Sequence, residues 1–402
     1  MSQPLELVGI PEETYSDYRY DLIFNAYKWD PQVEDHSTVS KYALLLSRET
    51  ARQLSTWAEL LSEETIQMEE ALIHRPDLAK KLGLPRKILT NLPRLKGYER
   101  NKHIRLMRFD FHPIQSGGWA VSEVNSDVPG GFAEASVCPE IAAKYFPQAE
   151  PGASVAESLF KEFRAKAGNT STIALIHATS YSDDRQVMQF IGDYFSDKGF
   201  LAVYAAPDHV QWKEKKALIT VDKNEAKLDS ILRFFPLEWL PNLPSHSIWE
   251  NYFDSETVSC NHPVAILTQS KRLPLIWDDL GTSVSTWKEL LPETRSPRKI
   301  SGDDWIFKPA LGRVGEGISI QEAVTPKEIL QIKKATLRYP EEWIAQRPFE
   351  SQSLLSACGN FLHLCIGVFT VGGQAAGFYG RISPYPRIDK RAQDIPVLVR
   401  KG

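Results

Sequence analysis

The chain has 402 residues and weighs 45.5 kDa, which is enough for two or three structural units because domains cluster at roughly 100–200 residues. Its composition, 42% hydrophobic and 24% charged, is typical of a folded globular protein and excludes a disordered or collagen-like chain. The 47 Lys and Arg residues against 51 Asp and Glu give a net charge of −4, which argues against a nucleic-acid-binding protein that works by counterion release.

The cysteines and the N-terminal residues predict the compartment. Four scattered cysteines form neither a disulfide framework nor a CxxC zinc motif. The first residues lack the basic and apolar regions of a secretory signal, and no run reaches the 18 apolar residues of a membrane span. We therefore expect a cytoplasmic protein without a membrane partner.

The first predicted elements are a long helix and a hairpin. Apolar residues between Ser47 and Ile73 recur at helical spacing, and Pro76 ends this pattern. From Tyr98 to Asn125 short apolar runs flank the polar glycine turn at 115–118, which indicates two antiparallel strands.

The middle of the chain alternates between helical and strand patterns. We predict helices at 154–167 and 184–198 and strands at 172–177 and 200–204. A helix between two short apolar strands indicates a βαβ unit with parallel strands. Residues 241–263 are rich in proline, asparagine and serine and predict a connection.

The last third of the chain predicts strands around a glycine-rich loop. Strand patterns lie within 300–320, 343–349 and 362–378, and a helix is expected near 325–335.

The first candidate site lies on the predicted hairpin. Side chains alternate along a strand, so Arg108 and Asp110 share one face of the first strand. By the same alternation, Glu123 and Asn125 share one face of the second strand. Carboxylate and amide oxygens are hard ligands that suit Mg²⁺, which is often completed by substrate phosphates. The structural alternative is an exposed cross-strand ion pair between Arg108 and Glu123.

The second candidate site is the glycine-rich loop at 308–318. It begins with Lys308 and continues through Gly312, Arg313, Gly315 and Gly317. Backbone N–H groups beside glycines can approach anionic oxygens while the two cations neutralise them, so the loop is suited to covering phosphates. It matches neither the P-loop nor the dinucleotide fingerprint, and an ordinary glycine-rich hairpin is the alternative.

Two further cations are weaker candidates. Lys271 precedes an apolar run and can serve as a second phosphate ligand or as a charged helix entry. Arg381 follows glycines near the last predicted strand and can contact a carboxylate or phosphoryl group, or lie in a surface turn. Zinc-protease and serine-hydrolase patterns are missing from the sequence.

Taken in order, these motifs resemble the glutathionylspermidine synthetase family. The resemblance rests on Arg108 with Asp110, on 123–129, on 235–239, on 261–263 with Lys271, and on 308–315. It implies an α+β, circularly permuted ATP-grasp fold with an inserted α/β substrate subdomain whose strands are parallel. The implied parts are N-terminal helices with the metal-binding hairpin at 1–150, a substrate subdomain at 151–260, and the ATP-binding lid with the rest of the core at 261–402.

The same resemblance implies a role for each matching residue. The Mg²⁺ ligands are Asp110, Glu123 and Asn125, and the catalytic arginines are Arg108, Arg313 and Arg381. The ATP-binding residues are Arg108, Asp110, Lys271, Lys308, Gly312, Val314, Gly315, Gln346 and Phe349. The substrate-binding residues are Ser126, Asp183, Asp184, Glu238 and Arg313.

The implied reaction is an ATP- and Mg²⁺-dependent ligation through an acyl phosphate. It joins a peptide-like or amino-acid carboxylate to an amine, such as a polyamine, so the partners are small molecules. The chain has no cysteine motif for the amidase domain of the bifunctional family members, and its C-terminal segment 382–402 departs from the family pattern. The alternatives are a phosphotransferase acting on a small acceptor and a non-catalytic nucleotide-binding protein of the same fold.

Overall fold

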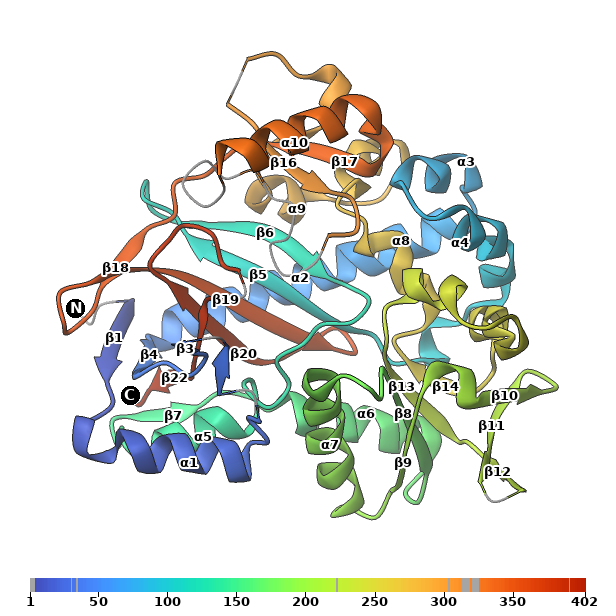
Figure 1. Ribbon diagram of the computed structural model, residues 1–402, viewed down its shortest axis with the longest axis horizontal. Coiled ribbons are helices and arrows are strands. Elements are labelled where there is room, and N and C mark those ends of the chain that lie inside the picture. The colour runs from blue at the N-terminus through green and yellow to red at the C-terminus, as the bar shows by residue number, and fades with distance from the viewer. Residues whose placement is uncertain are drawn as a thin grey trace.

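An antiparallel sheet built from two distant parts of the chain forms the centre of the molecule (Figure 1). The computed structural model describes residues 4–29, 31–33, 35–221, 223–302, 304–312, 319, 325–389 and 391–402. The strand order is β21–β20–β19–β5–β6, and β18 pairs with β19. These strands are β5 Leu106–Pro113, β6 Trp119–Asn125, β18 Ser353–Leu355, β19 Phe361–Val371, β20 Gln374–Ser383 and β21 Gln393–Ile395. The predicted hairpin is confirmed, and the strand pattern predicted within 362–378 corresponds to β19 and the first half of β20.

The long helix α2 (Arg48–Ile73) packs against the central sheet and confirms the predicted amphipathic helix. Ser47 caps it, because the Ser47 hydroxyl accepts a hydrogen bond from the Thr50 N–H at 3.1 Å. The apolar residues on its inner face, including Leu54, Leu61 and Met68, are buried.

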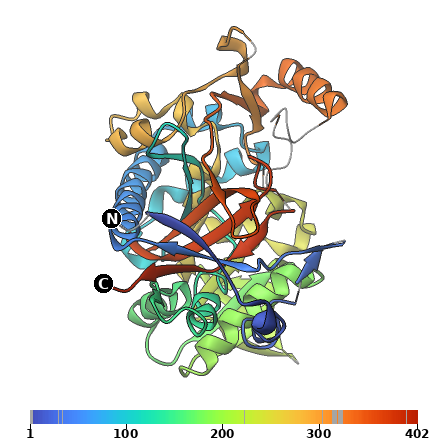
Figure 2. The same cartoon turned by 90° about the vertical axis from the view of Figure 1, so that its left-hand side faces the viewer.

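A second sheet joins the two ends of the chain. Its order is β1–β4–β22–β7, made of β1 Leu5–Gly9, β4 Tyr42–Leu46, β22 Val397–Arg400 and β7 Ala149–Pro151. Helices α1 (Tyr15–Asn25) and α5 (Val137–Ala143) contact each other, and β2 (Gln32–Val33) pairs with β3 (His36–Ser37). The chain ends lie near each other in both views (Figures 1 and 2).

A parallel sheet forms a separate layer, as the βαβ pattern predicted. Its order is β14–β13–β8–β9, made of β14 Val258–Cys260, β13 Ser230–Phe234, β8 Thr172–His177 and β9 Leu201–Ala205. Helices α6 (Val155–Ala167) and α7 (Ser182–Ser196) pack beside it (Figure 1). The antiparallel strands β10 (Val210–Lys213), β11 (Lys216–Val221) and β12 (Asn224–Lys227) project from it. The segment 241–263, predicted as a connection, contains 3-10 helices and the short strand β14. Local sequence does not indicate this strand, because it is defined by its pairing with β13.

A small sheet with α10 caps the molecule above the central sheet (Figure 1). It consists of β15 Thr294–Arg295, β17 Trp343–Gln346 and β16 Ile306–Pro309, with α10 at Pro326–Arg338. Short helices α3 (Pro76–Ala79), α4 (Arg86–Asn91), α8 (Ile266–Gln269) and α9 (Ser285–Leu290) surround this side. In the described part of the chain, no helix has both the length and the apolar character needed to cross a bilayer.

The sheets do not follow the order of the chain. The central sheet combines residues 106–125 with residues 353–395, so segments of the first and third predicted parts share one layer. The three-part division at 150 and 260 stays a prediction.

Candidate active site

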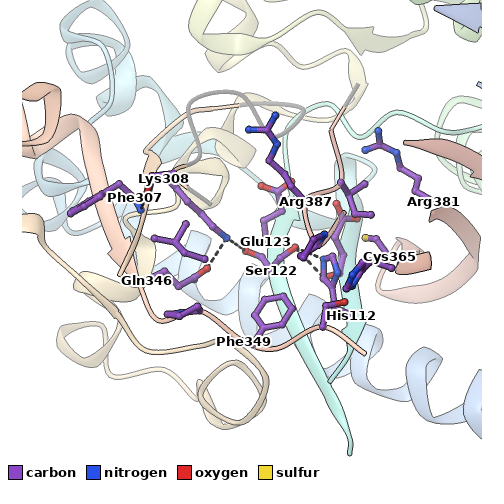
Figure 3. Close-up of a pocket in the computed structure, with 18 of the residues that line it drawn as sticks. His112, Ser122, Glu123, Phe307, Lys308, Gln346, Phe349, Cys365, Arg381 and Arg387 are labelled. Atoms are coloured by element: carbon purple, nitrogen blue, oxygen red, sulfur yellow. Dashed lines mark hydrogen bonds between the residues drawn. The ribbon is translucent and has the colours of Figure 1, made fainter. Parts of the chain in front are cut away.

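A cavity of about 850 Å³ lies between the central sheet and the β16–β17 hairpin (Figure 3). Its size is in the usual range for small-molecule sites. Eight of the predicted site residues line it: Arg108, Asp110, Glu123, Asn125, Lys308, Gln346, Phe349 and Arg381. Five strands and the segment after β17 therefore bring together residues up to 273 positions apart, from 108 to 381.

The β5–β6 hairpin supplies the carboxylates. Asp110 lies opposite Glu123 in the register, and Arg108 lies opposite Asn125. Arg108 donates to both oxygens of Asp110, at 2.7 and 3.0 Å, and Asn125 donates to Asp110 at 3.1 Å. The structural alternative, an exposed Arg108–Glu123 pair, is wrong, because Arg108 binds Asp110 and both side chains are only 10% exposed.

Arg108 is held in place on several sides. It donates to the Gly130 carbonyl at 2.6 Å, and its guanidinium lies 5.0 Å from the centre of the Tyr379 ring. Gly367 on β19 makes room for it, since a β-carbon there would lie 2.6 Å from Arg108 Cδ. Burial by itself lowers the pKa of Arg108, but Asp110 outweighs it and the pKa is raised. Arg108 is therefore a fixed cation at the cavity wall.

Lys271 reaches the site through Glu123. Its ammonium lies 2.9 Å from a Glu123 oxygen and donates to the Gly312 carbonyl at 2.7 Å. Burial tends to raise the pKa of Glu123, but the charges of Lys271, Lys308 and Arg108 lower it to about 2. Glu123 is therefore ionised at neutral pH, beside the described beginning of the glycine-rich loop.

Lys308 projects from β16 into the cavity (Figure 3). It donates to Gln346 Oε1 at 2.6 Å and to the Ser122 carbonyl at 3.3 Å. Burial lowers its pKa to about 8, and the charge of Glu123 offsets part of that effect. The Phe349 ring lies 5.2 Å from that of His112, which gives this part of the cavity an aromatic wall.

Arg381 lies on the side of the cavity opposite Phe307 and Gln346 (Figure 3). It donates to the Asp389 carbonyl at 2.6 Å. Its Nε is buried and has no hydrogen-bond partner among the described residues. A buried donor of this kind is suited to an anionic ligand, because leaving it unpaired is costly.

The structure does not bring four predicted substrate-binding residues to this cavity. Ser126 is fully buried and its hydroxyl contacts Arg105 and Thr268. Glu238 lies in a 3-10 turn at 237–242, and Asp183 and Asp184 lie in the first turn of α7. None of the four lines the cavity. The predicted roles require these side chains to lie close to the cavity, and spacing along the chain does not determine such distances across the fold.

The predicted loop is only partly described. Gly312 is described and its carbonyl accepts the Lys271 hydrogen bond. Arg313, Val314 and Gly315 lie outside the described residues.

Sequence reasoning missed three residues that shape the site. Gly367 leaves space for Arg108, Arg387 lines the cavity, and Asp389 binds both Arg381 and Arg387. Gly367 sits in an ordinary apolar strand and 384–389 is an irregular segment, so neither carries a local signal.

The residues present fit a Mg²⁺ ion bridged to phosphates. Asp110, Glu123 and Asn125 offer hard oxygen ligands on adjacent strands beside the cavity. The carboxylates are paired with Arg108 and Lys271, so a metal would share them with these cations. Among the described residues, no cluster of three His, Cys, Asp or Glu side chains could hold a metal alone, which is consistent with a site completed by substrate oxygens.

Comparison with known proteins gives one family and one similar fold. The sequence matches the family described as glutathionylspermidine synthase preATP-grasp over residues 15–400. The structure is similar to that of a glutathione synthetase like-effector from Globodera pallida in its apo form, with a TM-score of 0.67, 10% sequence identity and coverage of 96% of each chain. The architecture is therefore the α+β fold of the ATP-grasp ligases that the motifs predicted.

A second solved structure is more distant. A candidate γ-glutamylcysteine synthetase from Methylobacillus flagellatus has a TM-score of 0.40 and 12% identity, over 80% of this chain and 84% of that one. That similarity supports no conclusion about this chain. A comparison with curated proteins found no match.

Proposed function

Because this chain belongs to the glutathionylspermidine synthase preATP-grasp family, we propose that it is an ATP- and Mg²⁺-dependent carbon–nitrogen ligase that joins a carboxylate to an amine. The observation that carries the proposal is the cavity, where the Arg108–Asp110 pair, the Glu123–Lys271 pair and Lys308 converge. This set places cations for polyphosphate next to carboxylates for a metal.

The nucleotide would lie along the β16–β17 side of the cavity. Phe349 and Gln346 offer an aromatic wall and an amide to the base, and Lys308 and Lys271 neutralise the phosphates. When a nucleotide binds, a phosphate oxygen would replace Gln346 Oε1 as the acceptor of the Lys308 hydrogen bond. Gln346 therefore satisfies the Lys308 ammonium while the phosphate is absent.

The reaction needs no protein nucleophile. A carboxylate oxygen of the acid attacks the γ-phosphorus and ADP leaves, which gives an acyl phosphate. The amine nitrogen then attacks the acyl carbon, loses a proton and displaces phosphate. Arg108 and Arg381 lie beside the cavity where negative charge would accumulate, so they would stabilise the transferring phosphoryl group.

Asp110, Glu123 and Asn125 are the residues that would hold Mg²⁺. When bound, the ion neutralises phosphate oxygens and orients them for in-line transfer. Arg108 holds the Asp110 carboxylate in position by donating a hydrogen bond to each of its oxygens.

The acid and the amine are tested together. Purified protein is incubated with Mg-ATP and pairs of acids and amines, beginning with glutathione and spermidine because the family name identifies them. ADP release is measured and the products are analysed by mass spectrometry. We expect ADP, free phosphate and a new amide from at least one pair.

The control variants separate catalysis from folding. Asp110→Asn should strongly reduce ADP release, whereas Asp197→Asn changes an exposed carboxylate at the end of α7 and should not. A stable phosphorylated acceptor instead of an amide would replace the proposal by a phosphotransferase. Absence of both Mg-ATP binding and ADP release would reject it.

A further inference from the structure

Two arginines line the cavity near Asp389: the predicted Arg381, and Arg387, which no motif predicted. Arg387 belongs to the segment after β20 and lines the cavity together with Arg381. Figure 3 shows Arg381 on the side of the cavity away from Phe307 and Gln346, and Arg387 between Arg381 and Lys308. This segment belongs to the region that departs from the family pattern, so no motif assigns Arg387 a role.

Asp389 holds the two arginines in place. Its carbonyl accepts from Arg381 at 2.6 Å, and its carboxylate accepts from Arg387 Nε and Nη2 at 3.1 and 2.7 Å. The carboxylate also accepts from Arg391, through the backbone N–H at 2.9 Å and the side chain at 3.3 Å. Asp389 is only 6% exposed, so this bridge is fixed rather than a mobile surface contact.

Three carboxylates lie near these arginines. Asp394 lies opposite Arg381 in the β20–β21 register, and its oxygens bind Lys28 and Tyr379. Asp389 is one carboxylate shared by Arg387 and Arg391, and no described carboxylate forms an ion pair with Arg381. Glu328 is another nearby carboxylate. Its pKa is lowered mainly by hydrogen bonds from Thr325 and to a smaller degree by the charge of Arg387, and both hydrogen bonds go to one oxygen, Oε2. Two guanidinium groups fixed beside a cavity select anions with paired oxygens.

We propose that Arg387, fixed by Asp389 beside Arg381, binds an anionic group of the acid substrate other than the carboxylate that is activated. The acid is therefore a dicarboxylate or another dianion. This inference rests on the proposed function and names the substrate class for its acid site. Of the two lysines proposed for the nucleotide phosphates, Lys308 lines the cavity beside Gln346 and Lys271 is ion-paired with Glu123. The charge of Arg387 is then left for a second anion.

The test compares two small acids of similar length by calorimetry. Glutarate carries two carboxylates and butyrate carries one. Each is titrated into protein saturated with Mg²⁺ and a non-hydrolysable ATP analogue. We expect glutarate to bind about tenfold more tightly than butyrate or better, and Arg387→Gln to remove this preference.

Two further variants make the result specific. Arg391→Gln alters an arginine that shares Asp389 but does not line the cavity, so the preference for glutarate should remain. Arg387→Lys keeps the charge without the planar fork and should restore part of the preference.

Three outcomes would overturn the inference. They are equal or unmeasurable binding of both acids to the unmodified protein, an unchanged preference in Arg387→Gln, and weaker binding of the ATP analogue instead of glutarate in that variant. The last result would make Arg387 a phosphate ligand. Loss of nucleotide binding in the unmodified protein would instead reject the proposed function, so the two failures are distinguishable.

Discussion

Two buried arginine–carboxylate pairs lie on the same strand region but serve different purposes. Arg105, just before β5, pairs with Glu69 of α2 at 2.6 Å, and Arg108 within β5 pairs with Asp110 at 2.7 Å. Both arginines are buried and donate to both carboxylate oxygens. Burial and pairing alone therefore do not distinguish a scaffold from a site.

The difference lies in what surrounds each pair. Arg105 also donates to the carbonyls of Leu106 and Ser126, and Thr268 donates to Glu69, so this pair is enclosed by protein hydrogen bonds. The Arg108–Asp110 pair faces the cavity. A saturated pair fixes the backbone, whereas a pair open to a cavity can exchange its partners for a ligand.

The largest expected effect on stability comes from disrupting the enclosed Arg105–Glu69 pair. Glu69→Ala leaves Arg105 buried without its carboxylate, so we expect a loss of about 3–5 kcal/mol in the free energy of unfolding, measured with urea. Glu70→Ala, at the next and exposed position of α2, is the control and should change little. A loss below about 1 kcal/mol for Glu69→Ala would contradict the scaffold role.

Disrupting the Arg108–Asp110 pair at the cavity should reduce activity more than stability. Asp110→Asn removes one proposed metal ligand and the partner of Arg108, so we expect ADP release to fall by about 10²–10³-fold. The urea midpoint should shift much less than in Glu69→Ala, because ligand and water can reach Arg108 in the cavity. A variant that is active or fails to fold would remove the contrast between the pairs.

Moving Arg108 without changing its charge should give an intermediate effect. The added methyl group in Gly367→Ala meets the middle of the Arg108 side chain, which Asp110 and Gly130 hold, so it must displace the guanidinium. We expect kcat to fall on the order of 10–100-fold. Gly97→Ala, where a β-carbon meets nothing within 4 Å, is the matched control. Wild-type kcat in Gly367→Ala would show that Arg108 is free to adjust.

The charge of Lys308 should set an alkaline limit on ATP use. Its pKa is lowered to about 8, so the ammonium is present below this pH and is lost as the pH rises through it. We expect kcat/KM for ATP to be level below about pH 8 and to fall up to tenfold per pH unit above it. Lys308→Arg stays charged and should move the decline to higher pH. An unchanged profile in that variant would assign the decline to another group.

The smallest effect is expected at Asp183 and Asp184 in the first turn of α7. Asp183→Asn and Asp184→Asn change residues that do not line the cavity, so ADP release should stay within about twofold of the unmodified protein. A larger change in KM for the amine would instead support the role that the family resemblance implied for them.

The sequence was sufficient for the local elements and for half of the site. The helices α2 and α6 and the strand β8 follow from the apolar patterns of the sequence, and the structure adds Ser47 and Ser154 as the N-caps of the two helices. The facing of Asp110 and Glu123 follows from the strand alternation and the short turn, because the two strands are neighbours along the chain.

Only the tertiary structure decided the remaining contacts. Glu123 meets Lys271, β5 meets β19, and β22 enters between β4 and β7, although these partners are about 150–350 positions apart. The burial of Ser126 and the position of Arg387 beside Arg381 arise in the same way. Local patterns determine which backbone conformation and which face a segment adopts. Which distant segment then covers that face depends on the packing of the whole chain. That packing determined which charged side chains are enclosed by protein and which face the cavity.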